Sequence, residues 1–368
     1  VNPDGQIGWT RQIDIDPDLR IFEITPSENG IIACSGNGFN YGFNLMEINT
    51  QTGNIDWAER WWAGPDTTVL IQNITPLENS DSYWLAGDYN IDLGNNNYLQ
   101  RDFYGKYNSH TNSLDFIRSF NYYENAYTID ISGPIENAVL LNEHFYQTVH
   151  WADSTSSNVI LEALQPDGTI LFSKEYLPQV DSGTTYFPGA MLATEDALFL
   201  TGTVATENIL GSETLIIKLT PNGEVIWSKS YSSESLLYLQ GGSSLSQKAN
   251  GNILLGSQGA SGTIENPNNF HAFIEIDPDG IPIEAVQVDY TTLSDNHFYT
   301  FYKLLHRDST TTFVTINEDL SFEIRKVYED WTGCTPFLPL AIESEDVAAE
   351  VIEHQPTLED VPLERIPD

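Results

Sequence analysis

The chain of 368 residues carries 53 acidic and 15 basic side chains, which gives a formal net charge of −38. A field of this sign repels phosphate backbones and anionic lipid headgroups, so we expect no nucleic-acid partner. Hydrophobic residues make up 40% of the chain, which is enough for a sizeable core. No run of 18 apolar residues occurs, so the sequence predicts no insertion into a membrane.

The predicted elements are short strands that recur in chain order. A single strand, QIGWTRQID, comes first and is followed by five four-strand units over residues 21–62, 68–121, 127–178, 186–232 and 237–289. Residues 297–330 offer about three further strands. No window shows the 3.6-residue apolar period of a helix with caps. Units of 40 to 60 residues that each hold four strands are typical of propeller blades.

A hairpin motif marks the repeat. It is clearest in LQPDGTILFSKEY (164–176) and LTPNGEVIWSKSY (219–231), and weaker copies start at Val1, Ile48, Tyr107, Ile276 and Ile316. Gly between two alternating runs predicts a tight turn, because Gly adopts a positive φ without a Cβ clash. A large aromatic residue follows the glycine by four positions at Trp9, Trp57, Phe172 and Trp227. We interpret these aromatic residues as packing between neighbouring units.

The repeat predicts an all-β fold, a single β-propeller over residues 1–333. Six four-stranded blades are expected, with seven as the alternative, and the strand at the N-terminus would complete the last blade and so close the ring. Residues 334–368 read as an acidic, proline-containing tail or linker. The two cysteines, Cys34 and Cys334, lie near opposite ends of the chain, where ring closure would allow a bridge.

The hairpins at 164–176, 219–231 and 276–288 carry a resemblance to a known family. Pro-Asp-Gly or Pro-Asn-Gly followed by an alternating strand with Trp-Ser-Lys resembles the propeller repeats of secreted and surface proteins of the Bacteroidota. Many such proteins are cargo of the type IX secretion system. The resemblance implies a secreted or cell-surface location and brings no catalytic residue with it.

One loop-like stretch has the spacing of oxygen ligands for calcium. GDYNIDLGNNNY (87–98) places Asp88, Asn90 and Asp92 at alternate positions, although Leu93 stands where an EF-hand has glycine and the distal Glu is absent. The alternative is a polar connection whose Asn and Asp residues favour turns. Calcium is the one cofactor that this pattern suggests.

Adjacent aromatic residues follow two of the hairpin strands. In Trp61-Trp62 and Tyr122-Tyr123, one residue of each pair should face outward, because successive strand residues point to opposite faces. An exposed Trp or Tyr can stack on a sugar ring or bind a protein partner. Packing between neighbouring blades is the alternative.

These features favour a non-enzymatic, secreted or cell-surface module that binds a protein partner in an extracellular assembly. The sequence contains no GxSxG, Walker A or HExxH motif, so no catalytic residue is assigned. A propeller that binds or cleaves carbohydrate is the first alternative, since some of the 53 acids will lie at the separation that glycosidases use. A calcium-dependent adhesion module is the second.

Overall fold

The computed structural model describes residues 20–27, 30–37, 40–77, 81–94, 97–121, 138–152, 157–179, 185–205, 211–289, 300–307, 310–316, 322–328 and 338–366. Every regular element in these ranges is a β-strand, and the expected all-β class is confirmed there. In the same ranges, no helix exists that would be able to cross a bilayer.

The strands form six antiparallel sheets. The first sheet contains β1 (Arg20–Pro26), β2 (Gly30–Asn37), β3 (Asn40–Asn49), β4 (Ile55–Trp62) and β28 (Glu364–Ile366). The second contains β5 (Thr67–Pro76), β6 (Ser82–Gly94), β7 (Asn97–Asn108), β8 (Ser113–Asn121) and β27 (Thr357–Asp360). The third contains β9 (Ala138–Leu141), β10 (His144–Ala152), β11 (Ser157–Leu164), β12 (Ile170–Pro178) and β26 (Ala349–Glu353).

The remaining sheets continue the series. The fourth sheet contains β13 (Thr185–Ala193), β14 (Leu198–Ala205), β15 (Glu213–Leu219), β16 (Val225–Ser232) and β25 (Glu343–Asp346). The fifth contains β17 (Leu236–Gln247), β18 (Ile253–Thr263), β19 (Asn266–Ile276), β20 (Pro282–Asp289) and β24 (Leu338–Pro339). The sixth contains β21 (Thr300–Arg307), β22 (Thr310–Ile316) and β23 (Phe322–Tyr328).

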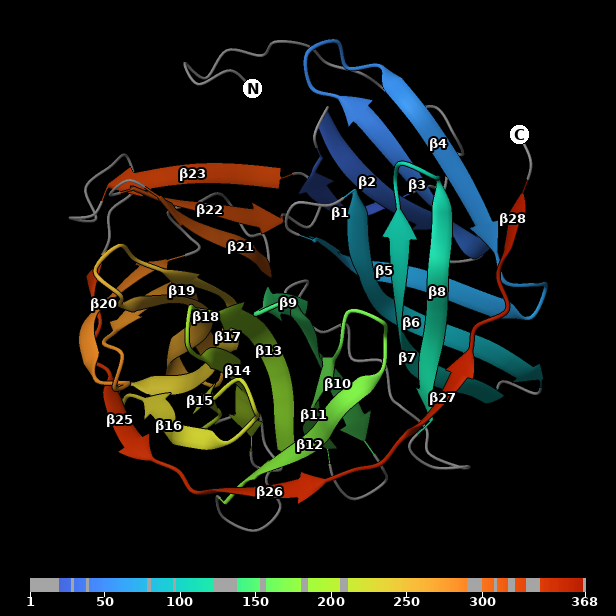
Figure 1. Cartoon of the computed structure of the whole chain (residues 1–368). Coiled ribbons are helices and arrows are strands. Elements are labelled where there is room, and N and C mark those ends of the chain that lie inside the picture. The colour runs from blue at the N-terminus through green and yellow to red at the C-terminus, as the bar shows by residue number, and fades with distance from the viewer. Residues whose placement is uncertain are drawn as a thin grey trace.

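The six sheets follow one another in chain order around a common centre (Figure 1). From β1 to β21, the first strand of each sheet contacts the first strand of the next, so these strands form the inner layer. The five predicted four-strand units correspond to the first five sheets, and the three strands predicted over 297–330 correspond to the sixth. The predicted N-terminal strand and Cys334 lie outside the described residues, whereas Cys34 is buried in β2.

The hydrophobic core is divided among the interfaces between consecutive sheets. One cluster joins the first two sheets, with Leu45 and Phe103 among its members. Another, built around Trp84 and Phe145, joins the second and third sheets, and their rings stack with centroids 4.7 Å apart. The apolar faces thus exclude water by packing sheet on sheet, as the alternating strands require.

The hairpin repeat builds these interfaces from its own side chains. Tyr176 and Tyr231 of the repeat each donate a hydrogen bond to the carbonyl of the turn glycine in the next sheet, over 2.8 and 2.9 Å. Tyr104 of β7, which precedes the repeat copy of its own sheet, makes the same kind of bond over 2.6 Å. The acceptors are the carbonyls of Gly168, Gly223 and Gly280, all with positive φ. A buried hydroxyl needs such a partner, so the repeated Tyr and Gly are coupled through space.

Where an aromatic residue stands four positions after the turn glycine, at Trp57, Phe172 and Trp227, it packs between sheets as predicted. Trp227 contacts Phe199 edge-on, with ring centroids 6.0 Å apart, and its Nε1 donates to the carbonyl of Pro278. Trp9 lies outside the described residues. The repeat is therefore structural at these positions.

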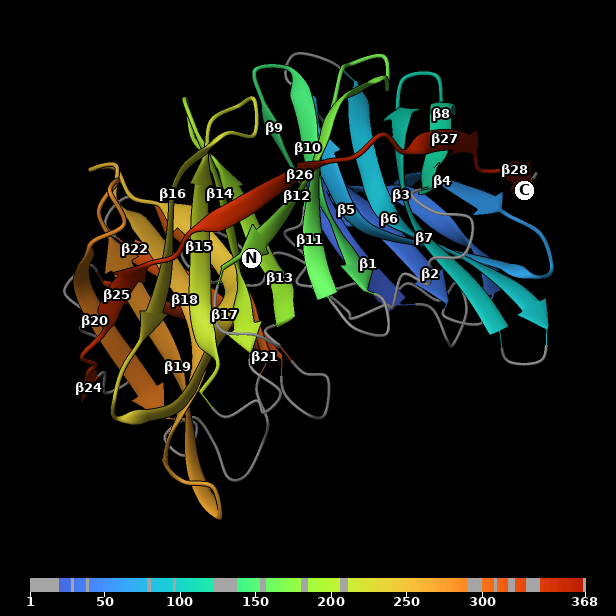
Figure 2. The same cartoon turned by 90° about the horizontal axis from the view of Figure 1, so that it is seen from below.

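The chain from 338 to 366, which we call the C-terminal segment, adds one strand to each of five sheets. Sequence analysis predicts a tail or linker here, but the segment visits the fifth, fourth, third, second and first sheets in that order. Figure 2 shows it crossing the outer strands of successive sheets, against the direction in which the chain built them. The physical reason is that the fourth strand of each sheet presents an open backbone edge, which an extended chain can satisfy whatever its composition.

Candidate functional site

The C-terminal segment binds through a backbone pattern that repeats every seven residues. The amides of Leu340, Val347, His354 and Val361 donate to the carbonyls of Ala285, Ser228, Ser173 and Ile117 over 2.9, 2.9, 2.9 and 3.1 Å. Each amide thus reaches the outer strand of a different sheet. Seven extended residues span roughly 23 Å, and one such period carries the segment from one outer strand to the next.

Side chains of the C-terminal segment follow the same period. Residues 340, 347, 354 and 361 point inward, as do residues 342, 349, 356 and 363, while most of the others are exposed. The inward positions are apolar in most of the seven-residue periods. Val361 is buried at the interface between the first two sheets. The segment therefore binds as an extended strip with one polar face and one apolar face.

Opposite charges face each other where the C-terminal segment pairs with the outer strands. In three consecutive sheets an acidic residue of the segment lies directly opposite a basic residue of the outer strand; the pairs are Asp360 with Arg118, Glu353 with Lys174, and Asp346 with Lys229. Lys229 and Asp346 form an ion pair, and the charged atoms of Arg118 and Asp360 lie 3.6 Å apart. The Lys174 ammonium instead contacts Glu224 at 2.6 Å.

Further polar contacts hold the segment within β27 and β28 and at the step that follows β26. His354 Nε2 lies 2.6 Å from Oε2 of the buried Glu175. Arg101 pairs with Glu359, and Arg365 pairs with Glu59. These contacts place basic and acidic groups in the order in which the segment passes them, so a shift in register would break several of them together.

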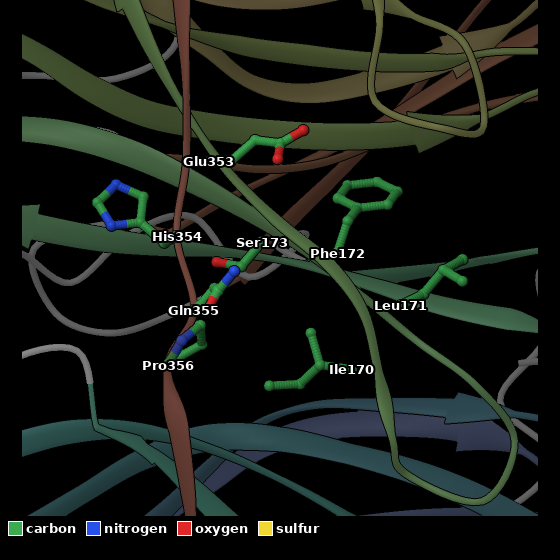
Figure 3. Close-up of a pocket in the computed structure, with 8 residues that line it drawn as sticks. All are labelled: Ile170, Leu171, Phe172, Ser173, Glu353, His354, Gln355 and Pro356. Atoms are coloured by element: carbon green, nitrogen blue, oxygen red, sulfur yellow. The ribbon is translucent and has the colours of Figure 1, made fainter.

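A pocket of about 410 Å³ lies between β12 and the C-terminal segment. Its lining comes from Ile170–Ser173 on one side and from Glu353–Pro356 on the other. Figure 3 shows Glu353 and Phe172 near one end and Ile170 and Pro356 near the other, with the His354 ring pointing away from Phe172. The pocket thus offers an aromatic ring beside carboxylate, amide and hydroxyl groups, a combination that suits polar ligands with an apolar face.

The C-terminal segment covers only the second half of each outer strand. Just before the covered part, Leu171, Ile226 and Ile283 occupy the equivalent position, three residues after the turn glycine, and are 41%, 49% and 55% exposed. These side chains recur on three consecutive sheets. The outer rim therefore carries a row of exposed aliphatic residues beside the C-terminal segment.

The predicted calcium ligands do not come together. Asp88, Asn90 and Asp92 lie within strand β6 and not in a loop, so their side chains are spread along it, with Asp88 buried and Asp92 exposed. Gln72 Nε2 donates to the Asp88 carboxylate. Across the described ranges, no group of three or more His, Cys, Asp or Glu side chains converges to hold a metal ion.

The predicted aromatic contacts divide between buried and undescribed positions. Trp61 is buried in the core between the first two sheets, so the structure corrects its assignment as a surface contact. Trp62 is half-buried, and its backbone pairs with Glu364 of the C-terminal segment. Tyr122 and Tyr123 lie outside the described residues. Trp61 is covered because it belongs to the cluster in which the second sheet packs against the first.

Sequence reasoning missed the C-terminal segment as a binding element, although a signal was present. ESEDVAA (343–349) and TLEDVPL (357–363) share a Glu-Asp-Val core, and their valines are 14 residues apart, or two periods. A sequence comparison within the tail at a period of seven would have found it.

Comparison with known proteins gives a remote likeness only. No protein-family model matches the chain, and no curated protein matches it. Among solved structures, polysaccharide lyase Uly1 is 11% identical with a TM-score of 0.49, covering 93% of this chain and 85% of that one. A glucose dehydrogenase is 10% identical with a TM-score of 0.42, covering 84% of this chain and 99% of that one. At this level the likeness carries no argument about function.

Proposed function

We propose that this chain is a single six-bladed β-propeller that acts outside the cytoplasm as a non-enzymatic protein-interaction module. In this proposal, the predicted N-terminal strand completes the sheet of β21, β22 and β23 and closes the ring. The net charge of −38 and the resemblance to secreted propeller repeats support a secreted or surface location. Export by the type IX system is part of the same proposal.

The single observation that carries the proposal is the binding of the C-terminal segment to five successive sheet edges. Strand addition of this kind is a general mode of peptide recognition, in which backbone hydrogen bonds supply affinity and side chains supply specificity. Here the specificity comes from acidic residues that face Arg118 and Lys229 at ion-pair distance and from Glu353, which lies opposite Lys174 in the register. The outer rim is therefore a surface that recognises extended acidic segments, and the chain's own segment is the occupant seen in the structure.

The test uses the full chain with its own segment weakened. We would replace Asp346, Glu353 and Asp360 by Lys, so that the segment repels the basic residues it faces. A fluorescent peptide of residues 343–361 should then bind this variant more tightly than the wild type, as measured by anisotropy. A peptide of the same composition with its acids moved out of the seven-residue register is the matched control. Equal binding of the two peptides, or no binding of either, would refute edge recognition.

A carbohydrate-binding role is the second candidate, favoured by the pocket beside β12. Phe172 offers a ring face, and Glu353 and Gln355 offer hydrogen-bonding groups to sugar hydroxyls. A panel of soluble polysaccharides should raise the thermal midpoint of the wild type, and the Phe172→Ala variant should lose that shift. The Ile226→Ala variant, altered on the next sheet, should keep it. A panel without effect on the wild type would leave this candidate without support.

A further inference from the structure

Two buried oxygen atoms between the second and third sheets lack any hydrogen-bond donor. Glu162 on β11 is 0% exposed, and Gln147 lies directly opposite it on β10 and is 2% exposed. Gln147 Nε2 donates to Glu162 Oε2 over 3.0 Å. Glu162 Oε1 and Gln147 Oε1 accept no hydrogen bond and are shielded from solvent.

Strand alternation places both side chains toward the second sheet. On β11, Leu161 and Ala163 pack toward the fourth sheet, so Glu162 between them points the other way. On the facing sheet, Tyr104 of β7 belongs to the cluster shared with the third sheet, and Asp102 stands two residues before it on the same face. Burial and the Asp102 charge both raise the pKa of Glu162 well above its ordinary value.

A second, partly buried carboxylate therefore faces one that is shielded from solvent and has an oxygen atom without a donor. Buried acceptors of this kind are rare in folded proteins and call for an explanation by an ion, a proton or a trapped water. The basic residues nearby are committed elsewhere. Arg118 donates to the Gly168 carbonyl and lies beside Asp360, and Lys174 contacts Glu224 and the Asn222 carbonyl.

We propose that Asp102, Gln147 and Glu162 form a binding site for a divalent cation, Ca²⁺, that joins the second and third sheets. Carboxylate and side-chain amide oxygens are the ligands that Ca²⁺ prefers, and it completes its shell with backbone carbonyls or waters. Two carboxylates balance its charge, and the Gln147 amide supplies a third side-chain oxygen. Asp88, one of the predicted ligands, lies directly opposite Asp102 on β6 and borders the site, and the site does not depend on the proposed interaction role.

The experiment compares thermal unfolding of the full chain in EDTA and in millimolar CaCl₂, at constant ionic strength in 150 mM NaCl. Because a ligand that binds only the folded state stabilises it, Ca²⁺ should raise the midpoint of the wild type by roughly 5 °C. The Glu162→Gln variant should lose most of that rise while remaining folded in EDTA. Asp102→Asn serves as a second variant at the same site and should also reduce it.

The matched control is Asp92→Asn, which removes one exposed carboxylate from β6 and should leave the calcium shift intact. A wild type without a shift would overturn the proposal, and so would an equal shift in Glu162→Gln, since surface acids would then bind the ion. If Ca²⁺ does not shift the wild type and Glu162→Gln is more stable than the wild type in EDTA, Glu162 and Asp102 share a proton and bind no metal ion.

Discussion

Lys229 on the outer strand of the fourth sheet and Asp346 of the C-terminal segment lie directly opposite each other, 117 residues apart in the chain, and form an ion pair. The Lys belongs to the hairpin repeat, in the motif Trp-Ser-Lys, and the Asp belongs to the seven-residue repeat of the segment. Two repeats with different periods are thus in register at this contact, and the same relation holds between Arg118 and Asp360.

Charge reversal at this contact should loosen β25. We expect Lys229→Glu to weaken the strand by about 1 kcal/mol, because like charges then face each other and solvent around the exposed Asp346 carboxylate screens them. Hydrogen exchange of amides 343–347 should become about fivefold faster, since that energy is a factor of about five in an opening equilibrium.

The double variant Lys229→Glu with Asp346→Lys is the control for that measurement. It restores opposite charges and should recover most of the protection. Unchanged exchange in the single variant would show that backbone pairing alone holds β25.

The stability of the calcium-free protein should depend on the charge of Glu162. Burial, together with the Asp102 charge, raises the folded-state pKa of Glu162 well above its ordinary value. The stabilising contribution of the neutral acid is complete below pH 4.5 and is lost as pH rises through the folded-state pKa. In EDTA, Glu162→Gln should therefore become increasingly more stable than the wild type as pH rises from 4 to 8, as read from urea unfolding.

The comparison for this pH series is the Glu275→Gln variant. The pKa of the wild-type Glu275 carboxyl is lowered, whereas that of Glu162 is raised. Its contacts with Lys248 and Asn252 outweigh burial and lower its pKa, so its contribution is present above the ordinary pKa and falls as pH drops. The two variants should diverge in opposite directions from the wild type at pH 7. Parallel behaviour would contradict a raised pKa for Glu162.

The turn glycine of the fourth sheet should tolerate no side chain. At Gly223 φ is +73°, and an added Cβ would lie 2.9 Å from both the Phe172 ring and the Tyr176 hydroxyl. Gly223→Ala should cost about 1 to 2 kcal/mol for the left-handed backbone and about 1 to 3 kcal/mol more for the clash. Equilibrium unfolding in urea measures the sum.

Gly251→Ala separates these two effects. Its φ is +88°, but an added Cβ there meets nothing within 4 Å. This variant should lose only the backbone part, about 1 to 2 kcal/mol. Equal losses in both variants would mean that the contact with the neighbouring sheet adds nothing.

The tyrosine that bonds the next turn should contribute to the interface between sheets. Tyr231→Phe removes the donor to the Gly280 carbonyl and leaves a buried acceptor unpaired, which should cost about 1 to 3 kcal/mol. Tyr238→Phe, whose half-buried hydroxyl bonds Asn269, should cost less than about 1 kcal/mol. A loss at Tyr238 as large as that at Tyr231 would argue against the special role of the inter-sheet bond.

Local sequence determined the strands, the turns and their grouping. Alternation, the turn glycines at 53, 168, 223 and 280, and the aromatic residue that follows the first three of them are short-range signals. The five four-strand units were therefore predictable within a few residues, apart from the start of the third. Tertiary structure decided what those signals could not. Strand addition requires only an extended chain and an open edge, so an acidic, proline-containing stretch became five strands once the sheets supplied their edges. The burial of Trp61 and the meeting of Asp102 with Glu162 were decided in the same way, because both depend on how one sheet packs against the next.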